Sequence, residues 1–589
     1  MATSGDDRNI GNLGRPLKTV QRAADLAQPG DVITVHQGVY RERVSPPRGG
    51  DSPERRIIYQ AVPGERVEVK GSELISGWKR EQGEVWKVVV PNGFFKGFNP
   101  FTNELRGDWF DPRGRKHHTG AVYLNGDWLV EAAKLELVLQ PEGTAAEWFA
   151  VVTPEETTLY ARFPQVDPNQ ERVEVNVRQT VFYPTSTGIN YLTVRGFVLR
   201  DAATPWAPPT AEQMGVIGTH WSKGWIIESN LVSHSICSGI ALGKYGDQWD
   251  NTSADTAEGY VETVNRALKN GWNQETVGGH LVRGNEISHC EQAGIVGSLG
   301  AVFSTIRDNS IHDIHERRLF SGAEMAGIKL HGAIDVQILH NHIYRTCRGI
   351  WLDWMAQGTR VSGNLLHENQ SDDVFAEVDH GPFLLDNNLL LSAVSVRDWS
   401  EGGAYVHNLF AGKLDTHPEL SRSTPFHPAH ATTVAGLTNI HGGDDRFLNN
   451  VFLGQGTNVA AGKNGYGLAG YDNTEYPILA AGNAYYRGAA ASSHDTNHAS
   501  DPGFDPQIKV VESGGRFSLV QNPVGMPTQP LVSVVSSSTL GISQVARLPF
   551  VAPDGSSIVF NLDYLGRPRS AEGARPGPLE KASDSILIW

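Results

Sequence analysis

The sequence predicts an all-β fold: a right-handed parallel β-helix, a solenoid with coils of about 24 residues, that carries an inserted antiparallel β-sandwich. A motif centred on asparagine recurs along the chain, and a second strand-like motif follows it by eight or nine residues. One aromatic-rich segment interrupts the repeat. Short strands at a fixed period indicate a solenoid, because each coil buries its apolar face only by stacking on the next coil.

The asparagine motif reads as two variable residues, Asn, one variable residue and an apolar residue. It occurs at Asn230, Asn285, Asn309, Asn341, Asn364, Asn388 and Asn408. Neighbouring copies are 23 or 24 residues apart where no loop intervenes, as from Asn341 to Asn364 and from Asn364 to Asn388. Asparagine tolerates left-handed backbone conformations and bonds to stacked copies of itself, so we expect it at the corner of each coil.

The chain divides into four predicted segments. Residues 1–70 hold a capping helix (KTVQRAADLAQPGD) and the first coils, and residues 71–185 form the sandwich, with tryptophan-rich strands such as GEVWKVVV and NGDWLVEA. Residues 186–505 form the main β-helix with the active site, and residues 506–589 form a C-terminal extension with sparse strands. The sequence SADTAEGYVETVNRALKNG predicts one helix in a loop of the main β-helix.

Composition disfavours several classes of function. Fifty basic and 65 acidic residues give a net charge of −15, which opposes binding to nucleic acid or anionic membranes and disfavours a polyanionic substrate such as pectate. The three cysteines are expected to be reduced core residues. No segment has the length and apolarity of a transmembrane helix or a secretory leader, so we expect a cytoplasmic protein, or a secreted one if a leader was removed. No cofactor is expected, whereas a structural calcium ion and homo-oligomerisation stay open.

Aligning the second motif places two acids in one column. In AGIKLHG, GIWLDW and DVFAEV the first and third strand positions are apolar and point inward, so the alternate positions point outward. This predicts that Asp353 and Glu377 emerge side by side from neighbouring coils about 4.8 Å apart. Two carboxyl groups about 5 Å apart are typical of retaining glycoside hydrolases, and their repulsion raises the pKa of one of them. One acid would attack the sugar and the other would donate and accept the proton.

Other side chains near this column suit a sugar-binding site, and Glu324 precedes a strand that reaches it. The predicted substrate-binding residues are Lys329, His331, Trp351, Trp354, Phe375 and His380. Acidic residues on the outside of a solenoid are more often solvent-exposed surface residues than catalytic ones. The surrounding aromatic, histidine and lysine side chains are therefore what favours a catalytic role for Asp353 and Glu377. Asp379 and Glu401, 22 residues apart, form an alternative pair. It is less favoured because the sequence His-Gly-Pro after Asp379 predicts a turn.

Long segments resemble family 120 of the glycoside hydrolases. They are AGIKLHG, GIWLDWMAQGTRVSGNLL, DDVFAEVDHGPFLLDNN, WSEGGAYVHNLFAG and the opening KTVQRAADLAQPGD. The resemblance covers nearly the whole chain and implies a parallel β-helix bearing a β-sandwich, with retaining β-xylosidase activity on xylo-oligosaccharides. It further implies an Asp nucleophile, a Glu acid/base and an additional active-site Glu. On the matching motifs these are Asp353, Glu377 and Glu324.

The predicted function is therefore a retaining exo-β-xylosidase that releases xylose from the non-reducing end of β-1,4-xylo-oligosaccharides. An α-L-arabinofuranosidase is an alternative, because pentoses differ little in outline. A polysaccharide lyase or pectin hydrolase is another, and it would need a basic groove or calcium-binding acids. A non-catalytic carbohydrate-binding β-helix would carry aromatic residues along many coils, whereas here the acids are confined to two.

Overall fold

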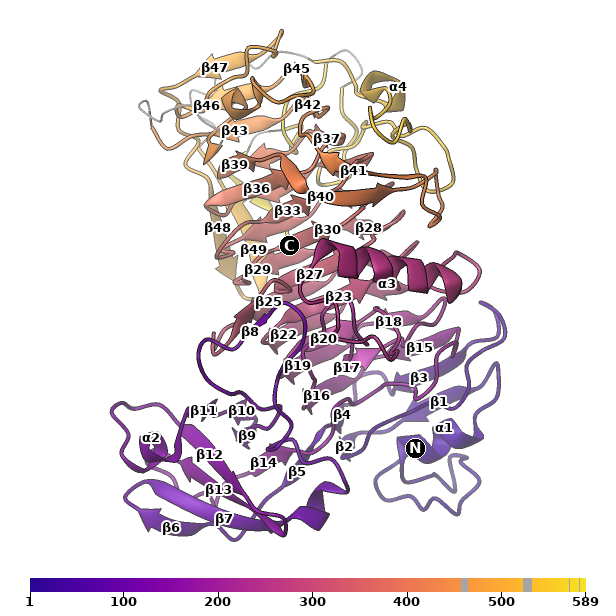
Figure 1. Cartoon of the computed structure of the whole chain (residues 1–589), viewed down its shortest axis with the longest axis vertical. Coiled ribbons are helices and arrows are strands. Elements are labelled where there is room, and N and C mark those ends of the chain that lie inside the picture. Colours follow the sequence, from indigo (N-terminus) through magenta and orange to yellow (C-terminus); the bar gives the residue numbers. More distant parts are fainter. Residues whose placement is uncertain (457–463, 523–531, 571–572, 582) are drawn as a thin grey trace. The chain divides into compact units, whose positions relative to one another are not determined.

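A computed structural model describes residues 1–456, 464–522, 532–570, 573–581 and 583–589. The chain forms two compact units, here called the first and second units. The first comprises Met1–Gly259, Asn285–Gly297 and Asp313–Met325, and the second comprises Tyr260–Gly284, Ser298–His312 and Ala326–Trp589. Each unit contains coils made of three parallel strands, so the predicted parallel β-helix is confirmed (Figure 1). None of the described helices is both long and apolar enough to cross a membrane.

The coils of the first unit begin behind the predicted capping helix, α1 (Val20–Leu26), whose first turn is capped by the Thr19 side chain. Sheet 1 of this unit contains β1 (Val32–Val35), β3 (Ile57–Ala61), β15 (Leu192–Arg195) and β18 (Ile226–Glu228). Sheet 2 contains β2 (Gly38–Tyr40), β4 (Val67–Lys70), β16 (Val198–Ala202), β19 (Leu231–Ser235) and β22 (Glu286–Cys290). Sheet 3 contains β17 (Gly215–Gly218), β20 (Ser238–Ala241) and β23 (Ala293–Ser298).

The second unit repeats this arrangement over more coils. Its sheet 1 contains β21 (Leu281–Arg283), β24 (Thr305–Arg307), β28 (Gln337–Leu339), β31 (Arg360–Ser362), β34 (Phe383–Asp386), β37 (Gly403–Val406), β42 (Arg446–Leu448) and β45 (Leu479–Ala481). Its sheet 2 contains β25 (Ser310–Ile314), β29 (His342–Tyr344), β32 (Leu365–His367), β35 (Leu389–Leu390), β38 (Leu409–Phe410), β43 (Val451–Leu453), β46 (Ala484–Tyr486) and β47 (Ala499–Asp501). Its sheet 3 contains β27 (Ala326–His331), β30 (Ile350–Asp353), β33 (Val374–Glu377), β36 (Val394–Trp399), β39 (Lys413–Thr416) and β44 (Asn464–Gly465).

The recurring asparagines form a ladder inside the coils. In the second unit each amide nitrogen donates to the side-chain oxygen of the next asparagine, as from Asn341 to Asn364 at 3.1 Å and from Asn364 to Asn388 at 3.0 Å. The same amide also donates to a strand carbonyl of the preceding coil, as Asn364 does to Ile338. The left-handed position is the residue before each asparagine, as at His340. The asparagines therefore lie at the corners as predicted, but because of their side-chain hydrogen bonds rather than their own backbone conformation.

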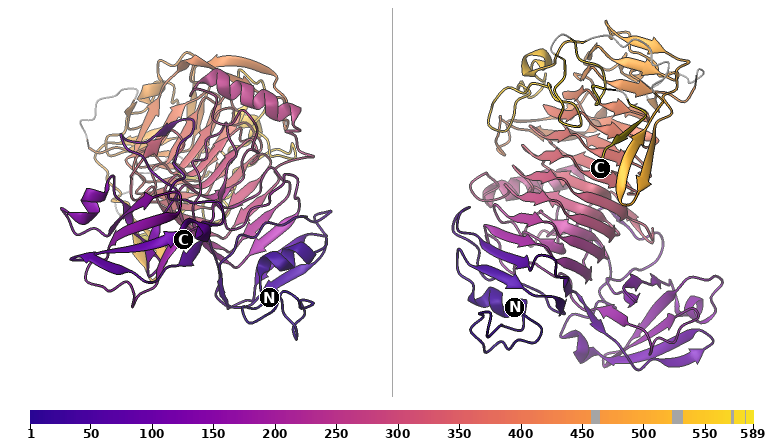
Figure 2. Two further views of the ribbon diagram at one scale, coloured as in Figure 1. Left: turned by 60° about the horizontal axis from the view of Figure 1, so that its bottom comes forward. Right: turned by 180° about the vertical axis from the view of Figure 1, so that it is seen from behind.

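The inserted β-sandwich of the first unit has two sheets packed around an aromatic core. One sheet has the order β10 (Asp127–Trp128), β9 (Val122–Leu124), β14 (Val173–Asn176), β5 (Ser72–Leu74). The other has the order β11 (Val130–Glu131), β12 (Glu147–Val152), β13 (Glu156–Arg162), β7 (Val85–Pro91), β6 (Lys79–Gln82). All their pairings are antiparallel except β11 with β12. Figure 2 shows the strands of the insertion from two further sides. Trp78, Trp86 and Trp148 lie in its core.

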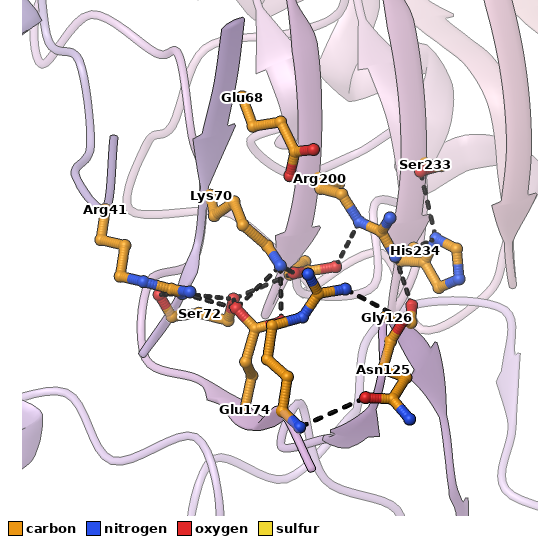
Figure 3. A network of polar contacts seen from close by, with 12 residues as sticks. Arg41, Glu68, Lys70, Ser72, Asn125, Gly126, Glu174, Arg200, Ser233 and His234 are labelled. Atoms are coloured by element: carbon orange, nitrogen blue, oxygen red, sulfur yellow. Dashed lines mark hydrogen bonds and ion pairs between the residues drawn. The ribbon is translucent and has the colours of Figure 1, made fainter. Parts of the chain in front are cut away.

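Smaller elements of the insertion are η1 (Asn92–Phe95), α2 (Leu135–Leu139) and β8 (Phe110–Asp111), which pairs with β26 (Ser321–Gly322). A buried ionic network ties the insertion to the coils of the first unit (Figure 3). Lys70, at the end of β4, contacts Glu174 of β14 at 2.6 Å and Asp201 of β16 at 2.9 Å. Arg41 reaches the same Glu174 carboxylate at 2.6 Å. Removing one partner of such a buried ion pair would leave an uncompensated charge. The network therefore holds the junction between the insertion and the coils in one arrangement.

Three additions cover the coils of the second unit. The predicted loop helix is α3 (Ala257–Lys269), and a long hairpin is formed by β40 (Glu419–Phe426) and β41 (Gly436–Ile440) (Figure 1). The C-terminal extension, which the sequence left unplaced, contains β48 (Lys509–Ser513), β49 (Arg516–Val520), α4 (Ser537–Leu540) and β50 (Ser585–Leu587). Its apolar side chains pack on sheets 1 and 2, through Phe550 against Leu384 and Phe517 against Tyr344 among others. Sheet 3 carries the candidate site. The remaining short helix, η2, spans Ala469–Tyr471.

Candidate active site

Two carboxylates lie side by side at the ends of adjacent strands. Asp353 ends β30 and Glu377 ends β33, and their Cα atoms are register partners, as the column alignment predicted. The apolar residues of the same strands, such as Ile350, Leu352 and Val374, are fully buried. Because successive strand residues point to opposite faces, the two acids share the other face of sheet 3.

Two nitrogen donors hold one oxygen of Asp353. Lys329 Nζ forms a short ion pair with Asp353 Oδ2, and His331 Nε2 lies 3.1 Å from the same oxygen. Asp353 Oδ1 is buried and has no hydrogen-bond partner among the described residues. Burial alone would raise the pKa of this carboxyl, but Lys329 and His331 outweigh it and hold the pKa below its usual range. Asp353 is therefore ionised at neutral pH and has one uncommitted oxygen.

Glu377 has a different environment. Its Oε2 accepts a hydrogen bond from Trp351 Nε1 at 3.0 Å, and its Oε1 accepts one from Arg422 Nη2 at 2.8 Å. Burial and the neighbouring Asp353 raise the pKa of Glu377 above its usual value, and Arg422 and Lys329 limit that rise. One carboxyl of the pair thus favours the ionised form and the other favours the protonated form, which is the division of roles that acid/base catalysis needs.

The column is more enclosed than the sequence suggested. Asp353 and Glu377, which the sequence placed on the outer face, are only 5% and 7% exposed, and Lys329 is fully buried. Arg422 on the β40–β41 hairpin reaches Glu377. Tyr260 on α3 lies 5.1 Å from the His331 ring and 5.3 Å from the Trp354 ring, measured between ring centroids. These insertions remove the acids from bulk water and so strengthen every electrostatic contact between them.

The predicted aromatic residues pack as a group against sheet 3. Trp351 and Phe375 stack with their ring centroids 5.1 Å apart, and Lys329 Nζ lies 3.0 Å from the Trp351 centroid. The guanidinium groups of Arg348 and Arg397 lie 4.8 and 5.4 Å from the Phe375 centroid. Trp351 thus reaches an acid directly, whereas Phe375 supports the stack.

His380 and the alternative acid pair serve the scaffold around this column. His380 Nδ1 lies 2.6 Å from Glu401 Oε1, and its Nε2 lies 3.1 Å from the Thr424 carbonyl oxygen of β40. Asp379 instead accepts a hydrogen bond from the Ala356 backbone at 2.6 Å, and burial raises its pKa well above the usual value. The side chains of Asp379 and Glu401 therefore bind different partners, and the His380 ring contacts the strand that carries Arg422.

Glu324, the predicted supporting carboxylate, belongs to the first unit. It lies in the segment Asp313–Met325, shortly before β27 in the chain, and its side chain is buried. Its predicted role stays a prediction.

The sequence did not single out Arg422 and Tyr260. Arg422 lies in the segment ELSRSTPF, where no spacing links it to Glu377, 45 residues earlier. Tyr260 lies within the predicted loop helix, and its amphipathic pattern indicated only that one face is buried. A loop long enough to fold back over sheet 3 was the available signal for both.

Comparisons with known proteins place this arrangement among carbohydrate-active proteins. The family model described as glycoside hydrolase 120, insertion domain, matches residues 75–175, and the model described as right handed beta helix region matches residues 263–410. A solved structure described as "The complex structure of XylC with xylose" is 40% identical, with a TM-score of 0.95 over 100% of this chain and 99% of that chain.

Two other solved structures show lower similarity. One described as "Glycoside hydrolase" is 12% identical, with a TM-score of 0.43 over 85% of this chain and 95% of that chain. The lacto-N-biosidase of family GH136 from Eubacterium ramulus is 13% identical, with a TM-score of 0.36 over 85% of this chain and 67% of that chain. A search among curated proteins finds no match. The predicted right-handed coil is confirmed by the matched β-helix model.

Proposed function

This chain belongs to family 120 of the glycoside hydrolases, and on that premise we propose that it is a retaining β-xylosidase. In this proposal it releases xylose from the non-reducing end of β-1,4-xylo-oligosaccharides. The similar structure that contains xylose supports the choice of sugar. The observation that carries the chemistry is the registered pair of Asp353 and Glu377, whose pKa values are shifted in opposite directions.

In the first step, the free Oδ1 of Asp353 attacks the anomeric carbon. The bond from that carbon to the leaving oxygen breaks, and Glu377 gives its proton to the leaving oxygen. Lys329 and His331 bind the other oxygen of Asp353 and so orient the attacking atom. An ester between Asp353 and xylose results, and the shortened oligosaccharide leaves.

In the second step, the ionised Glu377 takes a proton from water, and the resulting nucleophile attacks the same carbon. The ester bond breaks and Asp353 regains its charge. Two inversions at one carbon retain its configuration. Asp353, Glu377 and the attacking water account for every proton and electron-pair transfer, so the proposed mechanism uses no metal or cofactor. Glu324 is included as a supporting carboxylate on the strength of the family motif that it matches.

The test uses Asp353→Asn and Glu377→Gln. Asp353→Asn removes the nucleophile, and we expect turnover of xylobiose to fall by about 10⁴-fold. Glu377→Gln should lose about 10²- to 10⁴-fold on xylobiose but much less of its first step on an aryl xyloside with an activated leaving group. Azide should then restore turnover of that substrate by Glu377→Gln and yield a β-xylosyl azide.

Proton NMR of the first sugar released gives both the stereochemistry and the sugar. β-Xylose appearing before α-xylose supports retention, and α-xylose appearing first contradicts the proposed mechanism. Asp379→Asn is the matched control, because this buried carboxyl accepts a hydrogen bond from the Ala356 backbone and not from the groups that bind Asp353 and Glu377. Near-normal turnover by either catalytic variant would overturn the assignment of the pair.

A further inference from the structure

The first unit contains a cavity of about 220 Å³ where the insertion joins the coils. We call it the neck cavity and define it by Arg43, Glu73, Phe94, Lys96, Phe98, Arg178 and Gln179, among which Glu73 is the acid. Arg43 follows β2, while Phe94 and Lys96 lie in and just after η1, and Arg178 and Gln179 follow β14. No residue of this cavity belongs to the second unit, which carries Asp353 and Glu377. It is smaller than the roughly 300–1,000 Å³ of sites for drug-sized ligands, so it suits one small group.

The lining of the neck cavity carries positive charge that the protein does not neutralise. Arg178 is ion-paired with Glu73. Arg43 Nη2 donates only a long hydrogen bond of 3.5 Å to the Tyr183 carbonyl, and its Nε is buried without a partner among the described residues. Over the same described ranges, no carboxylate forms an ion pair with Arg43 or Lys96. Since a guanidinium stays charged in proteins, a partly buried and unpaired one favours an anion beside it.

The acid that acts on Arg43 electrostatically is already engaged. Glu212 acts on Arg43 electrostatically, but its Oε1 accepts a hydrogen bond from the Tyr183 hydroxyl at 2.8 Å and lies 3.3 Å from His220. Burial lowers the pKa of Arg43, and Tyr183 and Glu212 only partly offset that effect. The chain as a whole has a net charge of −15, so an uncompensated cationic cavity is local and is not a consequence of composition.

The remaining walls of the neck cavity suit a sugar ring. Phe94 and Phe98 are only half-buried, so part of each ring stays accessible beside the cations. Aromatic rings pack on the C–H face of a sugar, and the Gln179 amide can both donate and accept hydrogen bonds to hydroxyls. Cation, aromatic and amide groups together match a carboxylated sugar better than a bare inorganic anion.

The network of Figure 3 keeps the cavity in shape. Arg178 Nη2 donates to the Arg41 carbonyl at 2.8 Å, and Arg41 is bound to the Glu174 carboxylate that Lys70 also holds. The Val177 backbone N–H donates to Gly71 O at 2.9 Å, which joins the two chain segments that cross the neck. A cavity fixed in this way loses little conformational entropy on binding.

We propose that the neck cavity binds a uronosyl group, with Arg43 and Lys96 holding the carboxylate and Phe94 and Phe98 packing on the sugar ring. The choice of a sugar rests on the proposed function, whereas the negative charge of the ligand rests on the cavity alone. Binding at this site would give the enzyme a second contact with acidic branches of a xylan chain, apart from the two catalytic carboxylates.

The experiment titrates the full chain with methyl β-D-glucuronide and with methyl β-D-glucoside, which is its uncharged counterpart. Excess xylose is present to occupy the catalytic site, and binding is followed by calorimetry and ligand-observed NMR. We expect the glucuronide to bind at least tenfold more tightly than the glucoside, and its affinity to fall as salt is added. Equal affinities for the two glycosides would overturn the proposal. Inorganic phosphate binding as tightly as the glucuronide would overturn the sugar assignment.

Variants locate the binding. The double variant Arg43→Gln/Lys96→Gln should lose at least tenfold in glucuronide affinity. The single variant Lys96→Gln should lose about threefold, because Lys96 is exposed and solvent screens its charge. Lys79→Gln removes one exposed lysine elsewhere in the sandwich and should change nothing. Turnover of an aryl xyloside should stay at the wild-type level in all three. Unchanged glucuronide binding in the double variant would overturn the proposal, whereas the xyloside assay separately tests the proposed function.

Discussion

Replacing Arg422 by glutamine should move the alkaline limb of the pH profile upward. Arg422 Nη2 lies 2.8 Å from Glu377 Oε1 and is one of the groups that limit the raised pKa of that carboxyl. Glu377 must carry a proton to assist departure of the first leaving group. Removing the cation favours the protonated form, so its pKa rises and the fall in activity with increasing pH occurs later.

The size of the shift follows from the contact. An adjacent opposite charge changes a carboxyl pKa by about 1–3 units. The Arg422 side chain is 26% exposed and Lys329 remains near the pair, so the lower end applies. We expect an increase of about one unit, equivalent to about 1.4 kcal/mol.

The assay is kcat/KM on xylobiose measured across pH, since this quantity reports the free enzyme. Xylobiose is chosen because its poor leaving group depends on the acid. Ser423→Ala is the matched control: it removes the 2.6 Å hydrogen bond between Ser423 and Asn439 in the same hairpin without touching Glu377.

An alkaline limb that stays in place or moves downward in Arg422→Gln would refute this reasoning. A uniform loss of activity at every pH, shared with Ser423→Ala, would show that the hairpin only shapes the pocket. In that case burial and Asp353 alone would set the pKa of Glu377, and Arg422 would have no effect on it.

Three further changes test other parts of the structure. Lys329→Met removes the ammonium group beside Asp353, so the acidic limb of kcat/KM on xylobiose should rise by about 1–3 units, and an unmoved limb would contradict the ion pair. The Nε2 atoms of His342 and His367 lie 2.8 Å apart. Burial is the main cause that lowers the pKa of His342 to about 2 and the pKa of His367 to about 4. In the unfolded chain the pKa of each histidine is about 6.5. The contribution of the two neutral histidines to the free energy of unfolding is therefore complete above pH 6.5 and is lost as the pH falls, by about 3 kcal/mol for His367 at pH 4. The melting temperature should therefore drop less between pH 7 and pH 4.5 in His367→Gln than in the wild type, and an equal drop would count against the prediction. Asn364→Ala breaks the ladder and should cost about 3 kcal/mol in urea unfolding, while a loss below about 1 kcal/mol would show that the ladder contributes little.

The sequence by itself determined the coil and the pairing of the two acids. A strand has a side-chain period of two, and stacked coils repeat their register, so the alignment of IWLD with VFAE was enough to put Asp353 beside Glu377. The repeated asparagines could be recognised in the sequence for the same reason, because each side chain hydrogen-bonds the asparagine of the next coil.

Only the tertiary structure decided what surrounds the pair. Arg422 and Tyr260 lie on a hairpin and a helix inserted between coils, and no repeat fixes how such an insertion folds back. The enclosure of the acids, and thus the burial that raises the pKa of Glu377, depends on these contacts between distant parts of the chain. The neck cavity also depends on the tertiary structure, since Arg43 and Lys96 come from segments far apart in the sequence and line it where the insertion joins the first coils. Local periodicity specifies neighbours along a coil, whereas burial and charge at a site are set by whatever the rest of the chain places over it.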